Sequence, residues 1–458
     1  MIQRSLIFIV SLSLFMEAVD STVINTAIPA MSLSLGVHPL DLKIALISYL
    51  LSLAIFIPIS GWIADKFGTK RVFISALTIF SLSSLWCGFA PNLMGLVIGR
   101  LLQGLGGAMM VPVARLILLR TVSRHELIIV MSRVVTVSAL GLMLGPVLGG
   151  VITHYLSWHW IFWVNIPIGI IVVLIAAFGL KENITYDVPP LDKVGFVLFG
   201  IGLAELTFAL SSFSETYIPD KYSAIILFVA FLFLGAYFLH SRNQPNPIIK
   251  MQLFRIRTFR ISAQGNFLGR LSFGGVPFLL PLLFQFGLGY SAPLSGALLA
   301  PMAVGVLLVK IFTVRLLRWF GFKKLLVGNT FLVALSLWSF SFINTHTSIY
   351  VIALVTLIFG FLLSIQYSGL NSLAYGDIPV EELSSATSCM ITLQQISISF
   401  GVALSALLVR LFSHSFHATF ILTVETIHRA LFAMGIITFA MLFILFSLSP
   451  KDGTHLIK

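Results

Sequence analysis

The fold is decided by the stretch Ile44–Arg71, which reads IALISYLLSLAIFIPISGWIA over residues 44–64 and DKFGTKR over residues 65–71. The first part contains no charged residue and, as a helix, is long enough to cross about 30 Å of hydrocarbon. The second part is a short polar link in which Gly68 permits a tight turn. In lipid every backbone polar group needs an internal partner, so the stretch predicts a membrane helix followed by a loop.

The same pattern recurs along the whole chain. Its 458 residues are 58% hydrophobic and only 10% charged, whereas a soluble domain carries roughly a quarter charged residues. The short alternating segments of a membrane β-barrel are absent. We therefore predict an all-α polytopic membrane protein with fourteen transmembrane helices. They are expected at residues 5–28, 44–64, 72–90, 93–116, 132–155, 160–180, 194–212, 222–239, 261–286, 294–317, 325–343, 349–374, 385–412 and 426–448.

The formal charge of +12 is distributed unevenly between the polar links. Every second link is rich in basic residues, as around Lys70, Arg124, Arg257 and Lys323. The alternate links hold little beyond Lys43, Lys221 and Arg410. Because cytoplasmic loops collect Lys and Arg, we expect both termini of this multi-pass protein to face the cytoplasm. No basic patch forms a folded domain of its own, which argues against nucleic-acid binding.

An internal repeat divides the chain. DKFGTKR at residues 65–71 follows the second predicted helix, and RWFGFKK at residues 318–324 follows the second helix of the last six. Polar links at residues 181–193 and 240–260 separate two further helices from these halves. We predict an N-terminal six-helix bundle over residues 1–180, an inserted two-helix hairpin with its links over residues 181–260, and a C-terminal six-helix bundle over residues 261–458. Paired halves with a substrate site between them near the midplane are a transporter architecture.

Two carboxylates lie inside the first predicted helix. At about 100° per residue, Glu17, Asp20 and Ser21 share one face. An ionised carboxylate facing lipid costs several kcal/mol, so this face should line a cavity or meet a partner. Carboxylates three residues apart resist ionising together, which favours the binding of a proton near neutral pH. The pattern predicts proton coupling through Asp20 and Glu17, and a hydrogen-bonded structural patch is the alternative.

A cation in the fourth predicted helix lies at a matching depth. Arg100 is about 10 Å from the outer end of its helix and Asp20 about 12 Å from the outer end of the first helix, at 1.5 Å per residue. The two side chains can therefore meet, and a cation beside Asp20 favours release of its proton. A static buried ion pair is the alternative. We expect the substrate cavity to be lined by Glu17, Asn25, Gln103 and Arg270.

The fifth predicted helix contains GLMLGPVLGG at residues 141–150. Its glycines at four-residue spacing, Gly141, Gly145 and Gly149, form a smooth strip that another helix can approach closely. Pro146 removes one backbone hydrogen bond and can kink the helix, and Gly150 follows the strip. The pattern is compatible with static packing and with a contact that slides during alternating access.

Catalytic, metal and nucleotide sites find little support in the sequence. A phosphate-binding loop and a Gly-x-Ser-x-Gly nucleophile turn are both absent, so direct use of ATP is not expected. His414 and His417 have metal-like spacing but no third ligand nearby, so we predict no metal site. A membrane-embedded enzyme would need a polar cluster at one interface, and the histidines are scattered. We expect no cofactor, with the proton as the coupling ion.

Several motifs in the same order resemble the major facilitator superfamily, and within it the fourteen-helix drug:proton antiporters of the EmrB/QacA type. The resemblance covers nearly the whole chain. It rests on DSTVINTAIP at 20–29, GWIADKFGTKR at 61–71, RLLQG at 100–104, GPVLGG at 145–150 and WHWIFWVNIP at 158–167. Thr69 and His159 depart from the pattern, since that family commonly has a basic residue at the first position and Arg at the second.

The resemblance implies a multidrug-efflux transporter linked to antibiotic resistance. It implies a proton-coupled antiporter that exports small amphiphilic compounds from a bacterial-type inner (plasma) membrane by alternating access. Asp20 would be the proton site with Arg100 linked to proton transfer, and Gly61, Asp65, Gly68 and Arg71 would form the cytoplasmic gate. The expected partners are a small-molecule substrate and membrane lipid, with the chain acting as a monomer. The sequence does not determine whether a periplasmic adaptor takes part.

Export of a polar or anionic metabolite, such as a siderophore or organic acid, is the main alternative. A free Glu17 would favour lipophilic cations, whereas an unpaired Arg270 would favour anions, since an uncompensated buried charge seeks a counter-charge. A membrane-embedded enzyme is the remote alternative.

Overall fold

The computed structural model describes residues 2–122, 124–180, 185–213, 219–379, 382–413 and 422–456. His414, His417 and Lys181 lie outside the described residues. In the described part the regular elements are all helices, and they form 14 spans that are long and apolar enough to cross a membrane. The predicted all-α fold with fourteen membrane helices is therefore confirmed.

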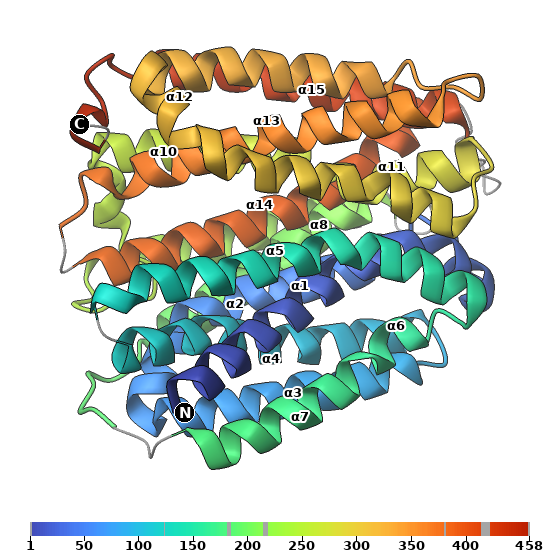
Figure 1. Ribbon diagram of the computed structural model, residues 1–458. Helices are drawn as coiled ribbons and strands as arrows, with labels where there is room; N and C mark the ends of the chain where they lie inside the picture. Colours follow the sequence, from blue (N-terminus) through green and yellow to red (C-terminus); the bar gives the residue numbers. More distant parts are fainter. Residues whose placement is uncertain are drawn as a thin grey trace. The chain divides into compact units, whose positions relative to one another are not determined.

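The first compact unit comprises residues Met1–Lys193 and Ser291–Ala297. It contains α1 (Ile2–Leu35), α2 (Lys43–Phe67), α3 (Thr69–Gly88), α4 (Leu93–Thr121), α5 (Arg124–Tyr155), α6 (Trp160–Trp163) and α7 (Asn165–Gly179). α6 and α7 together make one membrane span. Within this unit α1 lies alongside α5, as Figure 1 shows.

The second unit comprises Val194–Tyr290 and Leu298–Lys458. Its elements are α8 (Lys193–Ser212), α9 (Asp220–Arg242), η1 (Met251–Arg255), α10 (Arg257–Phe273), α11 (Val276–Leu282), η2 (Leu283–Gly287), α12 (Ala292–Phe340), α13 (Ile349–Gly376), α14 (Leu383–Phe412), α15 (Val424–Phe446) and η4 (Thr454–Leu456). α10, α11 and η2 form one span, whereas α12 holds two spans, and its first residues, 292–297, belong to the first unit.

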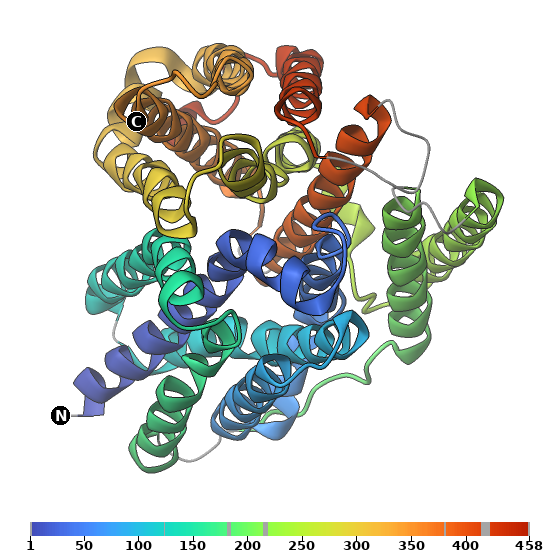
Figure 2. The ribbon, with the colours of Figure 1, turned by 90° about the vertical axis from the view of Figure 1, so that its right-hand side faces the viewer.

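The two helices of the predicted insertion, α8 and α9, pack against each other as a hairpin (Figure 2). The rings of Phe199 and Tyr237 are 5.4 Å apart, and Ser212 Oγ donates to Ser223 Oγ over 2.7 Å. Arg410 of α14 donates through Nη1 to the Phe213 carbonyl at 2.7 Å, which attaches the hairpin to the rest of its unit. The division of the chain at residues 180 and 260 stays a prediction.

The repeated loop sequence has the same structure in both units. Gly68 between α2 and α3 has φ of 88°, and Gly321, which interrupts α12, has φ of 70°. In this left-handed region a Cβ would be strained, so glycine allows each helix to turn directly into the next. Two residues later, Lys70 Nζ donates to the Leu180 carbonyl after α7, and Lys323 Nζ donates to the Phe446 carbonyl of α15, both at 2.9 Å. Each lysine thus caps the C-terminus of the last helix of its half.

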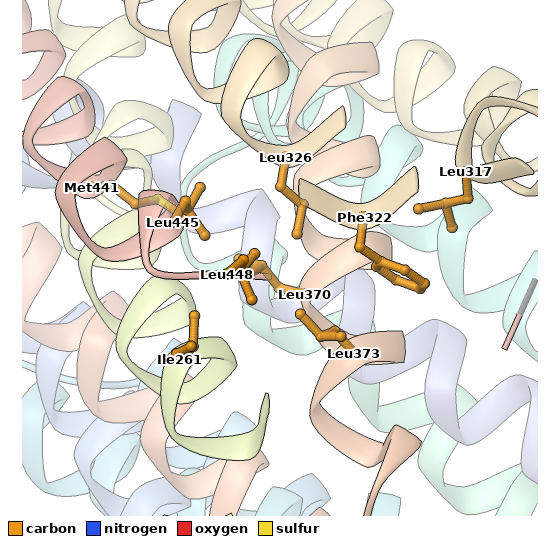
Figure 3. Packing of buried hydrophobic residues seen from close by; sticks show 9 residues of the cluster. All are labelled: Ile261, Leu317, Phe322, Leu326, Leu370, Leu373, Met441, Leu445 and Leu448. Atoms are coloured by element: carbon orange, nitrogen blue, oxygen red, sulfur yellow. The ribbon is translucent and has the colours of Figure 1, made fainter. Parts of the chain in front are cut away.

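Buried apolar side chains from α10, α12, α13, α15 and the turn after α15 pack together around the repeated loop at Gly321 (Figure 3). Phe322, directly after Gly321, is 2% exposed and packs in this cluster. A Cβ on Gly453 would lie 2.6 Å from the Phe322 ring, so the C-terminal turn also needs glycine to close over the cluster. The cluster consists of Ile261, Leu317, Phe322, Leu326, Leu370, Leu373, Met441, Leu445 and Leu448.

Candidate functional site

Asp20 lies at the centre of a buried polar network in the first unit. Its carboxylate is fully buried on α1, and its Oδ2 accepts from Arg100 Nη1 of α4 at 2.7 Å. Its Oδ1 accepts from Gln103 Nε2 at 2.7 Å and from Asn165 Nδ2 of α7 at 2.8 Å. Three helices therefore meet at one carboxylate. The structure has the Asp20–Arg100 contact that the helix depths predict.

The guanidinium of Arg100 is only 1% exposed and is enclosed on several sides. Its Nη1 also donates to Gln103 Oε1 at 2.7 Å, and its Nε donates to the Ala45 carbonyl of α2 at 3.4 Å. The Tyr49 ring lies 4.2 Å from the guanidinium carbon. Taking two charges out of water costs several kcal/mol per ion, and the ion pair together with these hydrogen bonds and the ring contact offsets that cost. Gln103 Nε2 also donates to Ser84 Oγ at 2.7 Å. The name Asp20 centre is used below for Asp20, Ser84, Arg100, Gln103 and Asn165.

The Asp20 centre can couple a proton to helix packing. An ionised Asp20 accepts hydrogen bonds from α4 and α7, and its charge compensates that of Arg100. A proton on Asp20 would neutralise the carboxylate and leave Arg100 without a counter-charge. Because an unpaired buried charge is costly, protonation would favour an arrangement of α1 and α4 that differs from this one.

Glu17 lies one turn before Asp20 and is half-buried. Its Oε1 accepts from the Tyr49 hydroxyl at 3.4 Å, and the Tyr49 ring is the one that covers Arg100. Tyr49 therefore connects Glu17 to the cation that Asp20 contacts directly.

The remaining candidates for the cavity differ in their surroundings. Gln103 is fully buried and uses its amide on Asp20 and Ser84, which places it inside the Asp20 centre. Asn25 is 7% exposed, and its Nδ2 donates to the Thr22 carbonyl of its own helix at 3.4 Å. Arg270 belongs to the second unit.

The glycine strip of α5 packs directly on the helix that carries Asp20. An added Cβ would lie 2.7 Å from the Phe15 carbonyl at Gly141, 1.9 Å from Thr22 Oγ1 at Gly145 and 2.3 Å from the Val23 carbonyl at Gly149. The Pro146 carbonyl also accepts from Thr26 Oγ1 of α1 at 3.2 Å. Gly150 faces Ala292 instead, in the segment 291–297 of the same unit. Only glycine allows this backbone-to-backbone approach.

Asp65 lies in the last turn of α2, beside the turn at Gly68, and the sequence did not show which residues it meets. We call residues 65–71 the Asp65 loop. Asp65 forms an ion pair with Arg120 at the end of α4, and the Tyr186 ring lies 4.8 Å from the Arg120 guanidinium carbon. The Tyr186 amide donates to the Asp65 carbonyl at 2.9 Å. Trp62 Nε1 donates to the Pro189 carbonyl at 2.7 Å, so the link after α7 is fastened across this loop.

The other expected gate residues lie within or beside this loop. Gly68 forms its turn, as described above, and Arg71 lies in the first turn of α3. Gly61 lies in α2, where an added Cβ would meet open space.

Tyr49, Ser84 and Asn165 also belong to the polar network, and none of them was predicted from the sequence. Asn165 stands in the apolar segment WVNIP, where burying a side-chain amide is costly unless it meets a polar partner. That signal was available, but the identity of the partner depended on how α7 packs on α1 and α3.

His159, in the turn before α6, stacks on Trp158 with ring centroids 3.9 Å apart. Burial lowers the pKa of His159 below its usual value, because the charged ring is desolvated. A neutral ring therefore stands where the resembled family commonly has Arg.

Comparison with known proteins agrees with this architecture. A family model described as Major Facilitator Superfamily matches residues 10–402. The probable transport protein HsrA of Haemophilus influenzae is 37% identical over 455 residues, covering 99% of this chain and 98% of that protein. The putative multidrug resistance protein MdtD of Citrobacter koseri is 38% identical over 408 residues, covering 89% and 86%.

Solved structures share the fold at low sequence identity. The structure of an auto inhibited POT family peptide transporter has a TM-score of 0.71 at 16% identity and covers 96% of both chains. The structure of a D-xylose-proton symporter has a TM-score of 0.70 at 13% identity and covers 99% of both chains.

Proposed function

The chain belongs to the Major Facilitator Superfamily and is a membrane-spanning transporter rather than an enzyme, and we propose that it is a proton-coupled antiporter that exports small amphiphilic compounds. The observation that carries this proposal is the Asp20 centre, where one buried carboxylate joins α1, α4 and α7. The MdtD relatives are named putative multidrug resistance proteins, which supports transport out of the cell. The experiment that tests the proposal is gradient-driven transport by the chain reconstituted in liposomes.

In the proposed transport cycle, a proton competes with Arg100 and two side-chain amides for the Asp20 carboxylate. When Asp20 is ionised, Arg100 and two amides hold α1 against α4 and α7. Protonation from the outer side weakens this hold and favours the alternate arrangement, and release of the proton into the cytoplasm restores it. The glycine strip of α5 allows α1 to shift along a smooth surface, because no α5 side chain interlocks with α1 at Gly141, Gly145 and Gly149. The proton is the only coupling agent in this scheme.

The Asp65 loop serves as the cytoplasmic gate in this scheme. The Asp65–Arg120 pair and the Tyr186 contacts join α2, α4 and the link after α7 at one end of the first unit. A partly exposed ion pair contributes only about 1 kcal/mol, which is enough to bias an equilibrium between two conformations several-fold.

Asp65→Asn is expected to slow turnover roughly fivefold while changing substrate affinity less than about twofold, because it shifts a conformational equilibrium by about 1 kcal/mol. Transport rate and binding of the same substrate are measured on the same preparation. Asp452→Asn is the matched control, since Asp452 forms a comparable ion pair with Arg257, at 3.4 Å, within the second unit. Normal turnover combined with weak binding would instead assign Asp65 a substrate role.

The proposed orientation places both termini in the cytoplasm of an inner membrane, with the chain working as a monomer. Single cysteines at Lys70 and Lys323, the lysines that cap α7 and α15, are expected to react only with membrane-permeant thiol reagents in intact cells. A cysteine at Lys221, at the start of α9, should react with impermeant reagents as well. Labelling at Lys323 by an impermeant reagent would overturn the orientation.

A further inference from the structure

Arg270 lies deep in the second unit, on α10. It is about 20 Å along the helix from Arg257 at 1.5 Å per residue, near the middle of the span Arg257–Gly287. The side chain is half-buried. A cation at this depth is expensive unless it meets a counter-charge, a polar partner or water.

The surroundings of Arg270 differ from those of Arg100. No carboxylate of the described residues lies within ion-pair distance of Arg270. The Tyr367 ring of α13 lies 4.0 Å from the guanidinium carbon. Nε is buried and lacks a hydrogen-bond partner among the described residues. The aromatic ring therefore covers one face of the guanidinium, while the Nε–H in its plane is left unsatisfied.

A polar stripe leads to Arg270 along the same helix. Ser262, Asn266 and Arg270 follow one another at four-residue spacing, so they lie on one side of α10. Ser262 and Asn266 are at most 1% exposed. Ser262 Oγ and Asn266 Oδ1 are both buried without a partner in the described part of the chain. Three successive turns thus each present an unsatisfied polar atom, which is unusual in a membrane helix.

We propose that Arg270, backed by Tyr367 and extended by Ser262 and Asn266, is a recognition site for the carboxylate of an amphiphilic monoanionic substrate. The in-plane N–H groups of a guanidinium match the two oxygens of a carboxylate, and a stacked ring holds the guanidinium in the orientation that this needs. A single uncompensated cation fits a single negative charge. Asn266 and Ser262 favour a ligand that carries a further hydrogen-bonding group.

The anionic group that Arg270 binds could belong to a membrane lipid or to a transported substrate, and the depth of Arg270 distinguishes the two. Lipid headgroups lie at the ends of a membrane span, whereas Arg270 lies near its middle. The ligand is therefore a transported carboxylate rather than a membrane lipid. The inference rests on the proposed export function and narrows its substrate class from amphiphilic compounds to amphiphilic monocarboxylates.

The test is equilibrium binding to the purified chain in detergent, without any gradient. The probes are benzoylglycine, salicylate and fusidate, each paired with its neutral methyl ester, and the cation tetraphenylphosphonium. At least one acid is expected to bind, and to bind roughly tenfold to a hundredfold more tightly than its ester, as a charge-assisted hydrogen-bonded pair provides. Arg270→Gln should weaken binding of the acid by a similar factor and leave binding of the ester unchanged.

Two further variants separate recognition from folding. Arg270→Lys keeps the charge but loses the planar fork, so its affinity for the acid should lie between those of the parent and Arg270→Gln. Arg260→Gln removes an exposed cation from the same helix and should change affinity less than about twofold. Equal binding of acid and ester, unchanged acid binding by Arg270→Gln, or binding of tetraphenylphosphonium alone would overturn the proposal.

The outcomes separate this inference from the export function. If acids bind in an Arg270-dependent way but no gradient-driven transport is observed, the carboxylate site is supported and the proposed export function is refuted. Gradient-driven export of any compound by a chain that binds none of the acids would keep the exporter and refute the site.

Discussion

Asp20→Asn is expected to reduce pH-driven export by the reconstituted chain roughly a hundredfold, to near background. Asn keeps the size of the side chain, but it has one acceptor oxygen instead of two and it cannot take up a proton. A coupling free energy of about 1–3 kcal/mol between proton and substrate corresponds to a factor of roughly 5–150 in the coupled equilibrium. Substrate flux driven by an imposed pH gradient is the measurement. Glu17→Gln should be milder, because the Glu17 carboxylate accepts only a long hydrogen bond from Tyr49.

A purely structural ion pair would also make Asp20→Asn harmful, since it leaves Arg100 buried without a counter-charge at a cost of about 3–5 kcal/mol. The double variant Asp20→Asn with Arg100→Gln removes both charges and distinguishes the two roles. Under the structural alternative the double variant regains both thermal stability and transport. Under proton coupling it regains stability but not gradient-driven transport. Asp20→Glu, which retains a titratable carboxyl, should keep measurable coupling.

Gly149→Ala is expected to reduce transport at least roughly tenfold and to lower the unfolding temperature. The added Cβ would lie 2.3 Å from the Val23 carbonyl, a backbone atom that no side-chain rotation can move. Overpacking of this kind costs about 1–3 kcal/mol and forces α1 and α5 apart. Because α1 carries Asp20, the separation also disturbs the Asp20 centre. Transport rate and thermal unfolding in detergent are measured together.

Gly145→Ala provides a matched comparison that can be rescued. Its Cβ would meet Thr22 Oγ1 at 1.9 Å, so Thr22→Ala removes the nearest clashing atom and should restore much of the lost transport. The corresponding Thr26→Ala should not rescue Gly149→Ala, because the Val23 carbonyl remains. Gly328→Ala, where an added Cβ meets no atom within 4 Å, should be neutral or slightly stabilising. Full activity of Gly149→Ala would show that close contact of α1 and α5 is dispensable.

The sequence predicted those features that depend on the regular geometry of a single helix. The fixed rise per residue placed Asp20 and Arg100 at one depth, and the four-residue glycine spacing indicated a smooth strip. Hydropathy also located the fourteen spans, although α1 extends to Leu35 beyond the predicted end at residue 28. Hydropathy reports where the chain contacts lipid, and a helix that includes Pro29 can continue past that boundary.

Features that depend on the rotation of one helix against another could not be predicted in this way. Nothing in the sequence indicated that α1 is the partner of the glycine strip, or that Asn165 of α7 reaches Asp20. The pairing of Asp65 with Arg120 likewise joins residues 55 positions apart through packing of α2 on α4. The side-chain periodicity of each helix was compatible with several such arrangements.

The most direct test of proton-coupled export is the exchange of substrate for protons by the reconstituted parent chain. Liposomes carrying a pH-sensitive dye inside are loaded with a transported substrate, and internal pH is followed when that substrate is free to leave down its own gradient. We expect substrate efflux to acidify the interior, with acidification abolished in Asp20→Asn liposomes of equal protein content. Substrate efflux at the parental rate without any change in internal pH would contradict the account.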